Sequence, residues 1–129
     1  MKLLNRSILC MLLAMSISAT AYAAEITAYD RAQFLKAQSE NKPILVEITA
    51  PWCPTCKVQK PILEKLTGQP QFKDLKIFEV DFDSKKDVLQ ELKVNKQSTL
   101  IVYKGKTEQG RSTGDTNEAS ISALINKSL

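Results

Sequence analysis

The sequence predicts a single α/β domain in which helices cover both faces of a mixed β-sheet. Apolar-rich runs at residues 44–48, 77–82 and 99–103 are typical of strands in a well-covered sheet. Segments whose apolar residues recur at helical spacing lie before, between and after these runs. With 129 residues, of which 43% are hydrophobic and 25% charged, the chain has room for one hydrophobic core.

The N-terminal segment has the composition of a secretory signal peptide. Lys2 and Arg6 are its only charges, an apolar stretch follows them, and residues 21–23 (Ala-Tyr-Ala) form a small-residue cleavage site. The apolar stretch is shorter than the roughly 20 residues that cross a bilayer. We therefore expect residues 1–23 to be removed and residues 24–129 to form an exported, periplasmic domain. An uncleaved N-terminal anchor is the alternative.

The first helix is expected at residues 30–39. Asp30 is a suitable N-cap, and Phe34, Leu35 and Ala37 give the helix one apolar face. An Asn-Lys-Pro sequence follows and ends the helix, because proline cannot continue it.

The next strand and helix flank two closely spaced cysteines. The strand at residues 44–48 holds one carboxylate, and Pro43 is tolerated at its start because the first strand position can spare its N–H. The helix is expected at residues 54–66, where Pro54 suits the first turn and Pro61 should kink the axis. The residues expected to face inward are Val58, Ile62, Leu63 and Leu66.

The rest of the chain is expected to form three strands and two helices. The strands are predicted at residues 77–82, 99–103 and 107–112, and the helices at 86–92 and 117–127. Asp115, with Glu118 three residues later, resembles a capping box for the last helix. The helix residues expected to face inward are Val88, Leu89, Leu92, Ile121, Leu124 and Ile125. The aromatic residues expected in the core are Phe34, Phe72, Phe78, Phe82 and Tyr103.

Cys53 and Cys56 are the only cysteines of the expected mature chain. They are too close together to staple distant parts of a fold, so their value must lie in chemistry. The chain has no His, and a zinc site would therefore need carboxylates to complete four ligands. The pair lies where a buried strand meets a helix, and unpaired N–H groups there stabilise a thiolate. We predict that Cys53 is an exposed nucleophile and that Cys56, more buried, resolves the mixed disulfide.

Three neighbours of the cysteines are predicted to contact the substrate. Trp52 offers a flat apolar surface immediately before the nucleophile. Pro54 and Thr55 separate the two sulfurs and determine how many N–H groups face the thiolate, because Pro54 has none. The redox-active pair needs no bound cofactor.

The segment at residues 52–57 (Trp-Cys-Pro-Thr-Cys-Lys) resembles the active-site motif of the thioredoxin family. Residues 44–50 resemble the central strand of that family, Pro61 its kinking proline, and residues 94–100 the loop and strand that close the site. The resemblance covers nearly all of residues 24–129. It implies the thioredoxin fold, a central mixed sheet flanked by helices on both faces, and dithiol–disulfide exchange.

The first departure from the family pattern is Ser98, which stands where the family has a cis-proline. A cis bond without proline costs about 3–4 kcal/mol, so we expect a trans bond before Ser98 or a rearranged loop. In the family this loop pairs with the bound substrate, and Gln97 and Ser98 are expected to do so less rigidly. Loss of proline is also expected to remove a bulky shield from the sulfurs.

The second departure is Glu47, which stands where the family usually has a buried Asp. Apolar residues flank Glu47 on both sides, so we expect it to be buried, with a raised pKa that suits it to relay a proton to Cys56. Glu79, on the neighbouring strand, is expected at the surface.

Our first hypothesis is a thioredoxin-like reductase of protein disulfides that receives electrons from a membrane donor. The same chemistry in reverse would make the chain a thiol oxidase. A different class of function is a metal-binding or metal-delivery module that uses the same thiolates, for which Ser98 is the specific support. A redox-inactive binding domain is a third hypothesis, and the intact cysteine pair argues against it.

The remaining expectations concern partners. Without Lys2 and Arg6 the net charge falls from +4 to +2, and no basic cluster indicates nucleic-acid binding. The sequence shows no dimerisation domain, so we expect a monomer. We also expect no bound metal.

Overall fold

The computed structural model describes residues 24–129, and the predicted signal peptide lies outside the described residues. Five strands form one sheet in the order β1-β3-β2-β4-β5. The strands are β1 (Ile26–Ala28), β2 (Pro43–Thr49), β3 (Lys76–Asp81), β4 (Thr99–Lys104) and β5 (Thr107–Thr113). The helices are α1 (Arg31–Ser39), α2 (Pro54–Thr67), α3 (Lys86–Glu91) and α4 (Glu118–Asn126), with a 3₁₀ turn, η1, at Pro70–Phe72.

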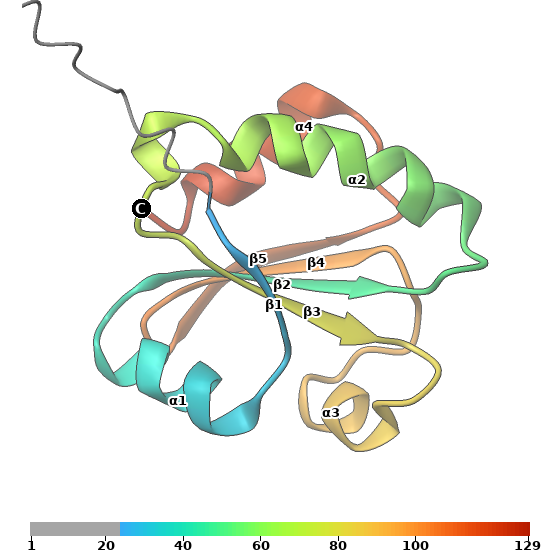
Figure 1. Ribbon diagram of the computed structural model, residues 1–129, viewed down its shortest axis with the longest axis horizontal. Helices are drawn as coiled ribbons and strands as arrows, with labels where there is room; N and C mark the ends of the chain where they lie inside the picture. The colour runs from blue at the N-terminus through green and yellow to red at the C-terminus, as the bar shows by residue number, and fades with distance from the viewer. Residues whose placement is uncertain (1–23) are drawn as a thin grey trace, which may run out of the picture.

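The sheet is mixed and covered on both faces, as the sequence predicts. β3 runs parallel to both β1 and β2, whereas β4 runs antiparallel to β2 and to β5. Helices α1 and α3 lie against one face and α2 and α4 against the other (Figure 1). Within residues 24–129, no helix is long and apolar enough to span a bilayer.

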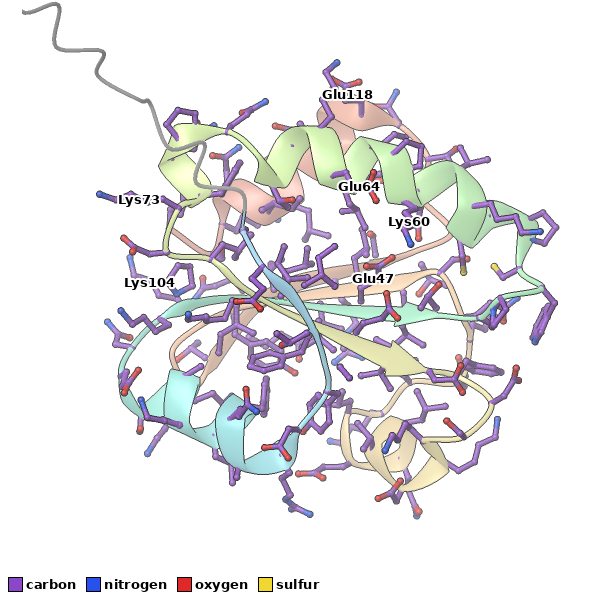
Figure 2. All side chains as sticks on the ribbon, in the orientation of Figure 1. Glu47, Lys60, Glu64, Lys73, Lys104 and Glu118 are labelled. Atoms are coloured by element: carbon purple, nitrogen blue, oxygen red, sulfur yellow. The ribbon has the colours of Figure 1, made fainter. Side chains whose placement is uncertain are left out.

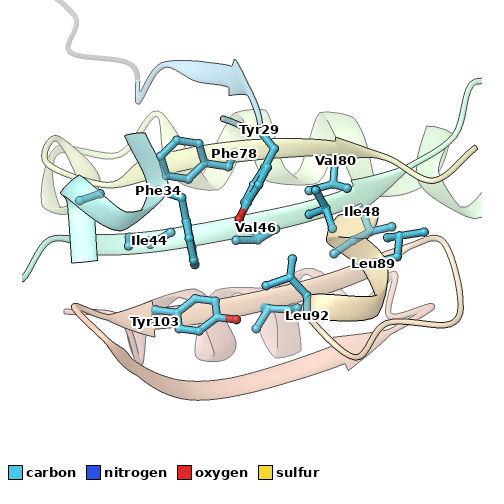
Figure 3. Close-up of a cluster of buried hydrophobic side chains, with 13 residues drawn as sticks. Tyr29, Phe34, Ile44, Val46, Ile48, Phe78, Val80, Leu89, Leu92 and Tyr103 are labelled. Atoms are coloured by element: carbon cyan, nitrogen blue, oxygen red, sulfur yellow. The ribbon is translucent and has the colours of Figure 1, made fainter. Parts of the chain in front are cut away.

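The central strand β2 divides its side chains between two hydrophobic clusters, because successive strand residues point to opposite faces. Ile44, Val46 and Ile48 pack on the α1 and α3 side, in the cluster of Figure 3. Leu45 packs on the other side, with residues of α2 and α4. Glu47 therefore points to the α2 side of the sheet, which is where the cysteines lie.

Two helix starts follow from their N-cap side chains. The Asp30 carboxylate accepts a hydrogen bond from the Gln33 N–H at 2.8 Å, so the predicted N-cap of α1 is confirmed. The predicted capping box of α4 is wrong. Asn117 is the N-cap and accepts from the Ser120 N–H at 3.0 Å, because α4 begins at Glu118 and an N-cap side chain reaches the third residue beyond it.

Several expectations about burial and strand number are corrected. Strand β1 was not predicted, because it is a short edge strand with only one large apolar residue. Leu35 and Val58 are each 50% exposed rather than inward-facing. Helix α2 instead buries the positions of Cys56, Gln59, Leu63, Leu66 and Thr67. Phe82 is only partly buried, whereas the other four predicted core aromatics are buried.

We expect Phe34 to contribute strongly to stability. Its ring lies 5.4 Å from that of Tyr29, 5.8 Å from Phe78 and 5.5 Å from Tyr103, measured between ring centroids. Phe34→Ala should lower the free energy of unfolding by about 3–5 kcal/mol, because it opens a cavity among these rings. Urea denaturation measures the loss. Leu35→Ala, on the adjacent exposed position, is the matched control and should change stability by no more than about 0.5 kcal/mol. Equal losses in both variants would contradict this role of the aromatic cluster.

Candidate active site

The two cysteines lie where the central strand passes into helix α2. β2 ends at Thr49, a short turn follows, and the Cys53 N–H donates to the Ala50 carbonyl oxygen at 3.1 Å. Cys53 is the N-cap of α2, and its sulfur accepts a hydrogen bond from the Cys56 N–H at 3.2 Å. Pro54 occupies the first turn and offers no N–H, so the N–H groups of the following residues face the sulfur.

Hydrogen bonds decide the ionisation of Cys53. Burial raises the pKa of its thiol, but hydrogen bonds from the Cys56 side chain, the Ser98 hydroxyl and two backbone N–H groups outweigh burial. The pKa of Cys53 therefore lies below its ordinary value. The helix start therefore favours the thiolate form of Cys53, as expected from the local structure.

The prediction that Cys53 is exposed is wrong. Cys53 is 1% exposed and Cys56 4%, so the first sulfur is no more accessible than the second. Ala50 and Phe82 pack against the two cysteines, and both sulfurs also contact Ser98, which is itself 3% exposed. Its Oγ lies 3.0 Å from the Cys53 sulfur and 3.1 Å from the Cys56 sulfur. The expectation that the loss of proline leaves the sulfurs uncovered is therefore also wrong.

The backbone at Ser98 is unusual. Residues 24–129 contain no cis peptide bond, so the expected trans bond before Ser98 is confirmed. Ser98 adopts a left-handed conformation with φ of 58°, which is rare for a residue other than glycine. Its carbonyl oxygen accepts from the Gly114 N–H at 2.9 Å and from Gln59 Nε2 at 3.2 Å.

Gln59 is a site residue that the sequence reasoning missed. It is 1% exposed, and its Nε2 also donates to the Asp115 carbonyl oxygen at 2.7 Å. It thus ties α2 to both the Ser98 loop and the segment before α4. The helical spacing that Gln59 shares with Cys56 and Leu63 could have indicated its burial, but not its hydrogen-bond partners.

Glu47 lies beside a cavity of about 310 Å³ that reaches Cys56. Glu47 is 4% exposed, so the prediction of a buried carboxylate is confirmed. Burial raises its pKa to about 7, Glu79 adds to the rise, and Lys60 opposes it. Figure 2 shows Glu47 beneath α2, with Lys60 extending from that helix on the same side of the sheet.

The expectation that Glu79 lies at the surface is corrected, because Glu79 is half-buried next to Glu47 and raises the pKa of that carboxyl. The two residues are directly opposite each other in the parallel pairing of β2 and β3, so both side chains point to the α2 face. Glu79 is half-buried and lines the same cavity. The other residues that line it are Thr49, Ala50, Pro51, Lys57 and Asp81. Three carboxylates, the two lysines Lys57 and Lys60, and the Cys56 thiol therefore line one cavity.

The predicted substrate contacts differ in exposure. Trp52 is 55% exposed, and its Nε1 donates to Asp83 Oδ2 at 2.7 Å. Pro54 is exposed, whereas Thr55 and Gln97 are half-buried. Within residues 24–129, no group of three or more His, Cys, Asp or Glu side chains is placed to hold a metal ion.

Comparisons with known proteins agree with this geometry. The Thioredoxin family model matches residues 25–127. Thioredoxin-2 of Saccharomyces cerevisiae is 37% identical over 87 residues, which cover 67% of this chain and 81% of that protein. The crystal structure of Trxlp from Edwardsiella tarda EIB202 has a TM-score of 0.76 and 40% identity, and the match covers 78% of this chain and 98% of that one. Thioredoxin NaTrxh of Nicotiana alata has a TM-score of 0.69 and 25% identity, over 81% of this chain and 92% of its own. The chain therefore belongs to the thioredoxin family and is a thioredoxin-type thiol–disulfide oxidoreductase.

Proposed function

We propose that this chain reduces disulfides of exported proteins, with Cys53 as nucleophile and Cys56 as resolving thiol. The observation that carries the proposal is the hydrogen-bonded Cys53 sulfur at the start of α2, with Cys56 one turn further on. The signal-peptide composition of residues 1–23 supports action in the periplasm. Electrons would then come from a membrane donor of thiol-reducing type, since the periplasm has no soluble thiol buffer that maintains reducing conditions.

The reaction has two exchange steps. The Cys53 thiolate attacks one sulfur of the substrate disulfide, a mixed disulfide forms, and the leaving substrate thiolate takes up a proton. Cys56 then loses its proton and attacks the Cys53 sulfur, which releases the second substrate thiolate. Two electrons have passed to the substrate, and the chain is left with a Cys53–Cys56 disulfide.

The covered position of Cys53 determines how a substrate must approach. Because Cys53 is 1% exposed, a disulfide can reach its sulfur only after some of the groups that cover it move. The exposed Trp52 ring offers an apolar surface beside the sulfur, with Pro54 and Thr55 next to it. Gln97 and Ser98 would contact the substrate from the opposite loop.

Glu47 is proposed to accept the Cys56 proton through the shared cavity. A carboxylate whose pKa is about 7 can take up and return a proton near neutral pH. Glu79 lies opposite Glu47 and its negative charge favours retention of a proton on the pair.

A thiol oxidase is the second candidate function, and the stabilised Cys53 thiolate is the observation that favours it. Hydrogen bonds that stabilise the reduced form make a dithiol pair more oxidising. Equilibration with glutathione measures the reduction potential of the pair. A potential more negative than that of the glutathione couple supports the reductase, and a more positive one supports the oxidase.

Cysteine substitutions test the two roles. Cys53→Ser should abolish reduction of insulin disulfides, because the attacking thiolate is gone. Cys56→Ser should accumulate mixed disulfides with substrate proteins, since nothing resolves them. Mass spectrometry of the trapped species identifies the sulfur that is bonded. Equal residual activity in the two variants, or trapping through Cys56 in place of Cys53, would contradict the assignment.

The Glu47 relay predicts a specific kinetic effect. Glu47→Gln should slow release of the substrate thiol from the mixed disulfide about 100-fold at pH 8, because the base is lost. Stopped-flow measurement across pH follows this step alone. Glu79→Gln removes a like charge, lowers the pKa of Glu47 and should move the pH midpoint of the step downwards. Glu118→Gln is the matched control, because Glu118 belongs to α4 and does not line the cavity, and it should leave the pH profile unchanged. An unchanged pH profile in Glu47→Gln would exclude the relay.

Glu47 also makes stability depend on pH. Its folded pKa of about 7 lies above the ordinary value of 4.5, so between these values the native chain holds a proton that the unfolded chain has lost. The contribution of this group is therefore present in full at low pH and is lost as the pH rises towards 7. Through Glu47, the free energy of unfolding is about 3 kcal/mol lower well above pH 7 than well below pH 4.5. Urea unfolding at pH 5 and pH 8 should show the fall in the natural chain and a clearly smaller one in Glu47→Gln.

A further inference from the structure

The Ser98 hydroxyl lies between the two sulfurs, and nothing in the two exchange steps above uses it. We propose that Ser98 is a catalytic residue whose hydroxyl donates a hydrogen bond to the Cys53 thiolate in the reduced chain and to the Cys56 thiolate during resolution. This inference rests on the proposed exchange at Cys53 and Cys56. Its basis is the placement of Ser98 Oγ 3.0 Å from one sulfur and 3.1 Å from the other, in a buried position.

The loop holds this hydroxyl in place from two sides. The Ser98 carbonyl oxygen accepts hydrogen bonds from the Gly114 N–H and from Gln59 Nε2. The left-handed backbone at Ser98 is unfavourable for a residue with a side chain and persists only where surrounding contacts enforce it. The neighbouring Thr99 hydroxyl is engaged elsewhere, because it bonds the Lys96 carbonyl oxygen at 2.8 Å and lies 3.0 Å from the Thr113 hydroxyl.

A hydroxyl carries one hydrogen and two lone pairs, so it can donate to only one sulfur at a time. In the reduced chain it donates to the Cys53 thiolate and can accept from the Cys56 thiol. After attack on the substrate, the Cys53 sulfur is bonded to the substrate sulfur and no longer carries the negative charge. The hydroxyl is then free to donate to Cys56, whose proton leaves to the proposed base.

With Ser98 in this position, the transfer of the hydrogen bond requires only rotation of the hydroxyl. Oxygen–sulfur distances of 3.0 and 3.1 Å allow the O–H to rotate from one sulfur to the other. Formation of the Cys53–Cys56 disulfide leaves no anion for the hydroxyl. Ser98 therefore stabilises the dithiol over the disulfide, which makes the pair more oxidising.

Ser98→Gly is the decisive variant, because glycine removes the hydroxyl and adopts a left-handed backbone without strain. We expect the pKa of Cys53 to rise by about one pH unit, measured from the ultraviolet absorbance of the thiolate. Release of a chromophoric thiol from a preformed mixed disulfide on Cys53 should slow about tenfold. The dithiol–disulfide equilibrium with glutathione should shift about tenfold towards the disulfide, which corresponds to about 30 mV.

Two further variants separate the hydroxyl from the backbone. Ser98→Ala also removes the hydroxyl but keeps the strained backbone, and it should match Ser98→Gly in the pKa of Cys53 and in thiol release. Ser128→Ala removes another buried hydroxyl, which bonds the Ile125 carbonyl oxygen at the end of α4, and it should leave both values unchanged. Effects in Ser98→Gly alone would assign them to the change in backbone and overturn the proposal.

Unchanged thiol release and an unchanged pKa of Cys53 in both Ser98 variants would likewise overturn it. Failure of the proposed function has a different signature. In that case the natural chain itself would not reduce insulin disulfides, whereas the comparison of Ser98 variants uses a small chromophoric disulfide and remains valid.

Discussion

The hydrogen bond from the Cys56 N–H to the Cys53 sulfur serves both the fold and the chemistry of the site. At 3.2 Å it caps helix α2 and, by the same contact, lowers the pKa of the thiol. The strand before it fixes where the helix can begin, and Pro54 directs the chain into the first turn without needing a hydrogen-bond partner. The reactive sulfur is thus part of the secondary structure, so disturbance of the cap would disturb the chemistry as well.

The other polar groups of the site are placed by the sheet. Because strand residues alternate between faces, Glu47 and Glu79 emerge from adjacent parallel strands on the side that α2 covers. Burial next to a second carboxylate is unfavourable for an anion, and the raised pKa of Glu47 is the result. A chain that only needed a stable core would place apolar residues at both positions.

Local patterns in the sequence predicted most of the fold and the position of the cysteine pair. The N-cap at Asp30, the buried strand β2 and the strand-to-helix junction depend on neighbouring residues and were predicted correctly. The burial of Cys53, by contrast, involves residues distant in the chain, among them Ser98, which contacts its sulfur from 45 positions away. The contact of Gln59 with Ser98 spans 39 positions and is equally invisible to local spacing. Strand β1 exists only because β3 offers it an edge.

The position of Trp52 has an experimental consequence. It is the only tryptophan in the chain, it precedes Cys53 directly, and its half-exposed indole is held by Asp83. The intrinsic tryptophan fluorescence of the protein therefore originates from a single place beside the reactive sulfur. A change in emission when reductant or a binding partner is added reports on that place alone, so the chain carries a built-in optical probe and needs no attached label.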